Sequence, residues 1–391
     1  MKKIILGIIV VFAFVAFFAS SFYMNSLNEK VFSYLNADTS YYKVEDINYT
    51  KGLLNSKGEF KVTLNNIPYS FKVHIDFSNI ILTSNNIKIF ILNENEDLSN
   101  IFSNEEILKI LINTKLNKKI IVNAKLNDLN TTYDDTDIVI KNLNFIINGS
   151  DIFIDNMQLN ADYILFGQSS QEDGMVELKN IKISEIPTSQ LKFEDILNPS
   201  RNSEQNTTIE SINFLNEIIL KNLNIYTKTT TNSQNNYDNI LEVNLANLQL
   251  LPNNFILDDI ALAMDFKNIS KEVYDKILQS SNTNLFSLIL LANNFLQTDP
   301  QIFLNNFSFS KENKKFVSNG QTIVKDNSIK SQVHIQSQLL PSQIIGDLEN
   351  FDEFFVDQNG SYVFDLIYDD SNKTDIKTII NGEQTDFMSV N

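Results

Sequence analysis

The sequence predicts a mainly β protein of the α+β kind: an extended, curved antiparallel sheet of many strands with a few packed helices, preceded by one N-terminal transmembrane helix. Most of the chain alternates apolar and polar residues, which is typical of strands with one face in water. Short polar turns separate these segments, as in an antiparallel meander. The first 24 residues differ, because they form one long apolar run.

This amino terminus has the pattern of a membrane anchor, which we assign to residues 1–24. The run Ile4–Met24 is interrupted only by two serines and would span about 31 Å as a helix, close to the thickness of a bilayer core. Lys2 and Lys3 precede it and predict a cytoplasmic amino terminus, so the bulk of the chain is expected outside the cytoplasm. The residues expected to contact the membrane are Ile4, Phe12, Phe18, Phe22 and Tyr23.

A cleaved signal peptide is the competing interpretation of the same run. Ala19 and Ser21 are small enough for a cut before Phe22, although the run is longer than a usual signal-peptide core. Residues 25–391 are expected to form one extracytoplasmic β-rich domain. It would begin with a short amphipathic stalk over Asn25–Asn36, with Leu27, Val31, Tyr34 and Leu35 on one face.

Strands and hairpins follow the stalk. Residues 59–64 and 69–77 alternate clearly, and at least ten segments of this kind are present. In 145–159 the pair Asn148-Gly149 predicts a type I′ turn between two strands. Residues 361–384 predict a second hairpin around a polar turn.

Helices are predicted in three places. Apolar residues recur at helical spacing over Asp97–Leu116, and Ser270–Phe295 reads as two helices, the second apolar nearly all round. Pro341–Val356 begins with proline in its first turn and presents Ile344, Ile345, Leu348, Phe351 and Phe355. The low-complexity stretches 198–208 and 227–239 are interpreted as long hairpin loops, with domain linkers as the alternative.

Composition excludes several classes of function. Lys+Arg 31 against Asp+Glu 48 gives a formal charge of −17, which disfavours nucleic acid as a partner. There is no cysteine, so disulfides, thiolate metal sites and cysteine nucleophiles are excluded. No glycine-rich nucleotide loop and no Gly-x-Ser-x-Gly turn occurs, and no cofactor is expected.

The remaining candidates for chemistry have simpler interpretations. His74 and His334 each lie inside an alternating segment, where a solvated or hydrogen-bonded histidine is the rule and a shared metal the alternative. The acidic segments 133–137 and 369–372 lack the spacing of a calcium loop and are typical of turns. We therefore predict a protein without enzymatic activity and assign no catalytic, cofactor or metal residues.

One short frame recurs three times, as IKNLNFI at 140–146, LKNIKIS at 178–184 and LKNLNIY at 220–226. The leading apolar residue and the next lie three positions apart, as in Leu220 and Leu223, which an uninterrupted strand would place on opposite faces. The Lys-Asn step therefore predicts either a β-bulge that returns both to one face or a strand that changes its buried side.

The exported chain resembles the YdgA-like envelope proteins, a family defined by a domain of unknown function. The resemblance lies in INYTKGLLNSKGEFKVTL (47–64), IALAMDFKNISKEVYDKIL (260–278), the segment 295–324, and VHIQSQLLPSQIIGDLENF (333–351) with IINGEQTDF (379–387). It implies a single-pass protein of the bacterial inner membrane with its bulk in the periplasm, and no catalytic residues. A His-Gly-Pro segment of some members has no counterpart here.

Two functions lead at this point, ahead of a third, a hydrolase that uses carboxylates which no spacing in the sequence identifies. The first is a non-enzymatic protein that binds an apolar or lipid ligand in a curved sheet, because the strands are rich in Phe, Ile and Leu. The loose similarity of the recurring frame to strands of AsmA-like envelope proteins, which hold lipid, points the same way. The second is an envelope scaffold that binds other proteins through sheet edges and its acidic surface.

Overall fold

The computed structural model describes residues 21–37, 42–64, 70–80, 85–93, 106–115, 118–133, 136–150, 152–167, 175–196, 201–274, 297–326 and 328–385. These residues form strands β1 to β23, joined by antiparallel ladders, which confirms the prediction of a mainly β chain built on antiparallel sheet. Contacts divide the chain into two compact units, residues 1–181 and 182–391. The division falls inside strand β11 (Val176–Pro187).

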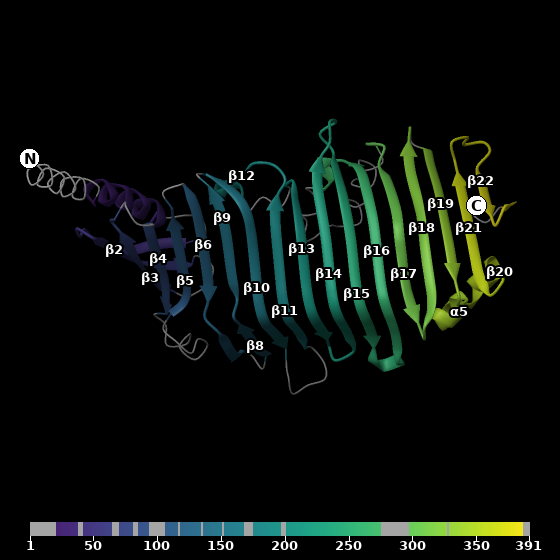
Figure 1. Ribbon diagram of the computed structural model, residues 1–391, viewed down its shortest axis with the longest axis horizontal. Coiled ribbons are helices and arrows are strands. Elements are labelled where there is room, and N and C mark those ends of the chain that lie inside the picture. Colours follow the sequence, from purple (N-terminus) through teal and green to yellow (C-terminus); the bar gives the residue numbers. More distant parts are fainter. Residues whose placement is uncertain are drawn as a thin grey trace, which may run out of the picture. The chain divides into compact units, whose positions relative to one another are not determined.

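In the first unit the antiparallel strands pair in the order β1, β2, β3, β4, β5, β6, β9, β10. β8 continues the line of β9 along the same edge of β10, and β7 pairs with β8 as β6 pairs with β9. Figure 1 shows β3 to β6 and then β9 and β10 running side by side. The bounds are β1 Tyr42–Thr50, β2 Asn55–Leu64, β3 Ser70–Ser78, β4 Asn85–Asn93, β5 Glu106–Thr114, β6 Lys119–Leu126, β7 Leu129–Tyr133, β8 Thr136–Lys141, β9 Asn144–Ser150 and β10 Phe153–Gly167.

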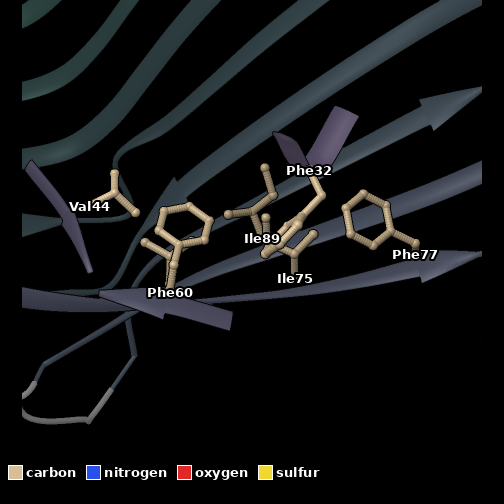
Figure 2. Packing of buried hydrophobic residues seen from close by; sticks show 7 residues of the cluster. Phe32, Val44, Phe60, Ile75, Phe77 and Ile89 are labelled. Carbon is tan, nitrogen blue, oxygen red and sulfur yellow. The ribbon is translucent and has the colours of Figure 1, made fainter. Parts of the chain in front are cut away.

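The core of this unit comes from alternate residues of its early strands. In β3, Val73, Ile75 and Phe77 are buried while the intervening residues are partly exposed, so the alternation read from the sequence is confirmed. Figure 2 shows how they meet Val44, Phe60 and Ile89 from neighbouring strands. Burial of these aliphatic and aromatic side chains is the main stabilising contribution here.

A helix over residues 21–35 packs against this core (Figure 1, purple). Its buried residues Met24, Asn28 and Phe32 lie four positions apart, on one face. Phe32 lies so close to the backbone of Gly58 that a side-chain carbon there would come within 2.3 Å of the ring. The predicted amphipathic helix is therefore present, but it docks on the strands: Val31 and Leu35 of the predicted face pack against the core, whereas Leu27 and Tyr34 are exposed.

Hydrogen bonds between polar side chains hold the same helix in one position on the strands. Asn79 is fully buried and donates to the carbonyl of Gly52 at 2.6 Å and to Ser56 at 2.9 Å. Asn28 on the helix donates to Asn79 at 2.8 Å, and Asn25 donates to the Gly52 carbonyl at 2.8 Å. Because buried amides are costly without partners, this network specifies one position for the helix.

The helix predicted over Asp97–Leu116 is wrong in its described part. Residues 106–114 form β5, a central strand paired with β4 on one side and β6 on the other. Its isoleucines suit a strand that is partly covered on both faces, and this pairing overrides the helical spacing of the sequence. Residues 97–105 lie outside the described part.

The hairpin predicted over 145–159 is present, but its turn lies later. Asn148 and Gly149 belong to β9, and the chain reverses between Ser150 and Phe153, which face each other across the ladder. Asn148 donates instead to Asn156 on β10, at 2.7 Å. The asparagine thus stabilises a cross-strand pair rather than a turn.

In the second unit the strands pair in the order β13, β14, β15, β16, β17, β18, β19, β21, β22, β23, again antiparallel (Figure 1). The short β20 pairs with β21 as well. The bounds are β12 Leu191–Lys192, β13 Ser203–Phe214, β14 Ile218–Thr231, β15 Tyr237–Leu250, β16 Phe255–Ile269, β17 Gln301–Lys311, β18 Lys314–Lys325, β19 Ser328–Ser337, β20 Val356–Gln358, β21 Ser361–Asp369, β22 Lys377–Ile380 and β23 Glu383–Gln384.

The described residues of the low-complexity stretches are mostly strand rather than long loops or linkers, and residues 198–200 lie outside the described part. Residues 203–208 belong to β13, and residues 227–231 and 237–239 lie in β14 and β15 on either side of a tight turn. Asn232 closes this turn by accepting the backbone N–H groups of Gln234 and Asn236. Threonine is favourable in strands, so polar composition alone concealed them.

The recurring frame contains a left-handed residue. Asn142, Asn180 and Asn222 have φ of 53°, 50° and 54°, a conformation that asparagine adopts more readily than most residues. Around Asn222 the pairing with β13 and β15 continues without a register shift, so the predicted β-bulge is wrong. Lys221 and Asn222 are exposed and Leu220 and Leu223 are partly buried, so the Lys-Asn step coincides with a left-handed residue inside a continuous ladder.

The remaining predictions are met in part. The hairpin over 361–384 is confirmed as β21 paired with β22. The helix over Pro341–Val356 is broken into a short helix α5 (Pro341–Ile344) and a 3-10 helix η3 (Gly346–Phe354), because Ile345 is extended. In Ser270–Phe295 residues 271–274 are helical, and the rest lies outside the described part. Short 3-10 helices η1 (Phe193–Asp195) and η2 (Leu251–Asn253) complete the elements.

Candidate functional site

The candidate site is an apolar pocket in the second unit, and its floor is one face of strands β17, β18, β19 and β21. Phe309 of β17 faces Phe316 of β18, and their rings stack at 4.6 Å between centroids. Ile335 of β19 faces Phe364 of β21 in the same way. Residues at alternate positions share a face, so these side chains form a continuous apolar surface.

The cover of the pocket is the segment from Leu339 to Phe355, which contains α5 and η3. Figure 1 places α5 at one end of the strands β18 to β21. Pro341 starts α5 with its fixed φ, and Leu340 donates its backbone N–H to the side-chain carbonyl of Gln343 at 3.0 Å. Ser342 then donates its backbone N–H to Asp352 at 2.9 Å, which ties α5 to η3.

One strand residue and one turn residue hold this cover in place. The Nζ atom of Lys311 donates to the carbonyl oxygens of Gln343 at 2.6 Å and Ile344 at 2.9 Å. These are free carbonyls at the end of α5, where a cation is favourable. Asn381 donates its side-chain amide to the carbonyl of Phe354 at 2.7 Å. The cover is therefore fastened at both ends.

Between floor and cover lies a cavity of about 480 Å³. Phe355 of the cover stacks on Phe364 of the floor at 5.4 Å, and Phe351 stands half exposed beside it. Every lining side chain is apolar: Phe309, Phe316, Ile335, Leu339, Pro341, Ile344, Leu348, Phe351, Phe354, Phe355, Phe364, Leu366 and Ile380. Such a surface can hold a hydrocarbon chain, and it offers no group for acid-base chemistry.

The opposite face of the same strands carries a polar groove. The groove has a volume of about 610 Å³. Its lining includes Phe303, Asn319, Gln321, Gln332, His334 and Asp365, together with neighbouring residues of the same strands. His334 and Asp365 are hydrogen bonded at 2.7 Å, and both are about half exposed. Amides and one solvated pair dominate this groove, so it lacks the desolvated environment of an active site.

The other histidine lies in the first unit and is also hydrogen bonded. His74 contacts Glu59 at 2.9 Å and Asp76 at 3.2 Å, and the hydrogen bond from His74 lowers the pKa of Glu59. The prediction that both histidines are hydrogen-bonded strand residues is confirmed. Among the described residues no group of three or more potential metal ligands is found.

The acidic segment 369–372 lies at a turn, as predicted. In 133–137 the described residues Tyr133 and Thr136 pair at the ends of β7 and β8, and Asp134 and Asp135 lie outside the described part. At the end of β21, Asp369 receives hydrogen bonds from the side chain and backbone of Ser371, and with the nearby Lys330 these lower its pKa to about 2. Asp370 is buried and accepts the backbone N–H of Ile329, which stabilises the neighbouring strand.

In comparisons with known proteins, no family model, no curated protein and no solved structure matches the chain. The resemblance to the YdgA-like family therefore stays a prediction, and the pocket has to be interpreted from its own geometry.

Three of the residues predicted to contact the membrane lie outside the described part, namely Ile4, Phe12 and Phe18, and so do Lys2 and Lys3, which were predicted to set the orientation. Phe22 and Tyr23 are described and are exposed at the start of the helix over 21–35. Ser21 and Met24, also inside the predicted anchor, are buried against the first unit. Within the described residues, no helix has both the length and the apolar character of a membrane span.

Proposed function

We propose that the protein is a non-enzymatic binding protein whose pocket between the strand face and the α5–η3 cover holds the apolar part of a lipid. In this proposal residues 1–24 anchor the chain in a bacterial inner membrane, and the folded units stand in the periplasm, as in the YdgA-like family. The observation that carries the proposal is the wholly apolar lining of a cavity of about 480 Å³.

Both size and chemistry support a hydrocarbon ligand. Pockets for small molecules usually have volumes of roughly 300–1,000 Å³. Burial of about ten methylenes would contribute about 8 kcal/mol at roughly 0.8 kcal/mol each, which exceeds the lower estimates of about 4 kcal/mol for the cost of association. A purely polar ligand would lose its hydration in this cavity without gaining a partner.

A single-tryptophan reporter tests this proposal, since the chain has no natural tryptophan. Phe351→Trp places the reporter in the cover, where Phe351 is half exposed. We expect brominated hexadecanoate to quench its fluorescence in a saturable way when the full chain is held in lipid nanodiscs, because the ligand would lie in contact with the indole.

The matched control is Ile367→Trp, on the opposite face of β21 and 40% exposed. It should show only the weak, non-saturable quenching of a solvent-exposed residue. Equal quenching of both reporters would contradict the proposal. A chain that binds no lipid but yields one recurrent protein crosslink would favour the scaffold function instead.

A further inference from the structure

We propose that the ligand of this pocket is a single-chain amphiphile with an anionic head group, a carboxylate or a phosphate, which is bound by Lys311 and Lys314 at the edge of the cavity. This inference rests on the proposed function and names its ligand class. It begins from the order of residues along one strand face, where the apolar floor of the pocket ends in two ammonium groups.

Lys311 and Lys314 form the last pair of the β17–β18 ladder, two residues beyond the stacked pair Phe309 and Phe316. Glu312 and Asn313 make the turn between them, both with positive φ. Because strand residues two apart share a face, both lysines lie on the face that carries the phenylalanines. The cavity floor therefore passes directly from aromatic rings to two cationic side chains.

The two lysines lack an acidic partner in the part of the chain that the structure describes. Lys311 contacts the neutral carbonyls of Gln343 and Ile344 and lies over the ring of Phe255 at 5.2 Å. Lys314 is exposed and makes no ion pair with a described residue. Like charges directly opposite each other in a ladder destabilise it, and an anion between them removes this cost. The two lysines form a local positive charge in a chain whose net charge is −17.

Lys311 can bind an anion without releasing the cover. An ammonium group has three N–H donors, and the two carbonyls of α5 occupy two of them. The third donor and the whole of Lys314 remain for a head group, while the chain of the ligand enters between Phe309, Phe316 and Ile344. Charge-assisted hydrogen bonds to a carboxylate or phosphate are stronger than those between neutral groups.

The test compares three ligands that share one hydrocarbon chain: hexadecanoate, hexadecanol and hexadecyltrimethylammonium. Each displaces the brominated probe from the Phe351→Trp protein, as full chain in nanodiscs of zwitterionic lipid. We expect hexadecanoate to bind roughly three- to tenfold more tightly than hexadecanol, and the cationic ligand to bind most weakly. Higher salt should reduce the advantage of hexadecanoate.

Charge removal then locates the head group. Lys314→Gln should reduce the advantage of hexadecanoate and leave the affinity for hexadecanol unchanged. Adding Lys311→Gln should abolish the difference between the two affinities, while both affinities fall because Lys311 also holds the cover. Lys315→Gln is the control, because Lys315 is the next residue and points to the other face of β18. Lysophosphatidic acid in the same assay distinguishes the head groups: tighter binding than hexadecanoate supports a phosphate, and weaker binding a carboxylate.

The outcomes separate this inference from the function on which it rests. Equal affinity for hexadecanoate and hexadecanol, or an advantage that survives removal of both lysines, overturns the anionic head group and leaves an apolar pocket. Failure of all three ligands to displace the probe overturns both.

Discussion

Replacing Leu366 by tryptophan is expected to weaken the binding of hexadecanoate at least tenfold, which corresponds to about 1.4 kcal/mol. Leu366 lies on β21 between Val333 of β19 and Ile380 of β22, and its side chain forms part of the cavity floor. The larger indole would fill the space that the hydrocarbon chain needs. Binding of radiolabelled hexadecanoate to the full chain in nanodiscs, corrected for empty nanodiscs, measures the effect.

The fold should tolerate this change, because added atoms enter an open cavity rather than a closely packed core. Ile367→Trp is the matched control, since it is the next residue, faces the other side of β21 and is 40% exposed. Its affinity for hexadecanoate should equal that of the unmodified protein. Loss of binding in the control but not in Leu366→Trp would place the ligand in the polar groove instead.

Replacing Phe77 by alanine should lower the free energy of unfolding of the first unit by about 3–5 kcal/mol. Phe77 is 1% exposed, and its ring meets Phe32 at 6.4 Å and Tyr49 at 6.0 Å between centroids. The lost contacts would leave a cavity exactly where the helix over 21–35 rests on the strands (Figure 2). Chemical denaturation followed by circular dichroism gives the change in stability.

Phe166→Ala in β10 is the control, because it removes the same atoms from a side chain that is 56% exposed. It should change stability by less than about 1 kcal/mol. Hydrogen exchange should also show residues 21–35 losing protection in Phe77→Ala and keeping it in Phe166→Ala. Equal protection in both variants would mean that the helix is held by its polar network and not by the aromatic contact.

The sequence predicted the antiparallel β character because local alternation survives in the fold. In β3 the residues Val73, Ile75 and Phe77 are buried, as alternation predicts, while Phe71 at the start of the same face is partly exposed. The alternation failed where long-range pairing decides. Residues 106–114 have apolar residues at both strand and helix spacing, and only the neighbours β4 and β6 select the strand.

The local backbone conformation was harder to predict from the sequence than the strands themselves. The spacing around Asn222 indicated an irregular step in the strand, but the sequence pattern did not distinguish a bulge from the left-handed residue that is present. Asn148-Gly149 is a frequent turn pair, yet it lies inside β9, because the pairing with β10 places the reversal three residues later. The turn propensity of this pair competes with the register of strand pairing, and the register decided where the chain turns.

The sequence indicates the cover of the candidate site but not its floor. Apolar residues recur over Pro341–Val356, and four of them, Ile344, Leu348, Phe351 and Phe355, line the pocket. The prediction treated them as one helix, whereas the break at Ile345 lets α5 and η3 lie over the strands. The floor could not be foreseen, because it needs Phe309, Ile335 and Leu366 from three strands in one register.

The most direct test of a lipid ligand in this pocket is photolabelling with a hexadecanoate that carries a diazirine near its methyl end. The full chain in nanodiscs is irradiated and digested, and the labelled residues are identified by mass spectrometry. We predict label on residues of the cavity, among them Ile335, Phe351 and Phe364, and its loss when unlabelled hexadecanoate competes or when Leu366 is tryptophan. Label confined to residues 1–24, or spread over the strands without competition, would contradict the account.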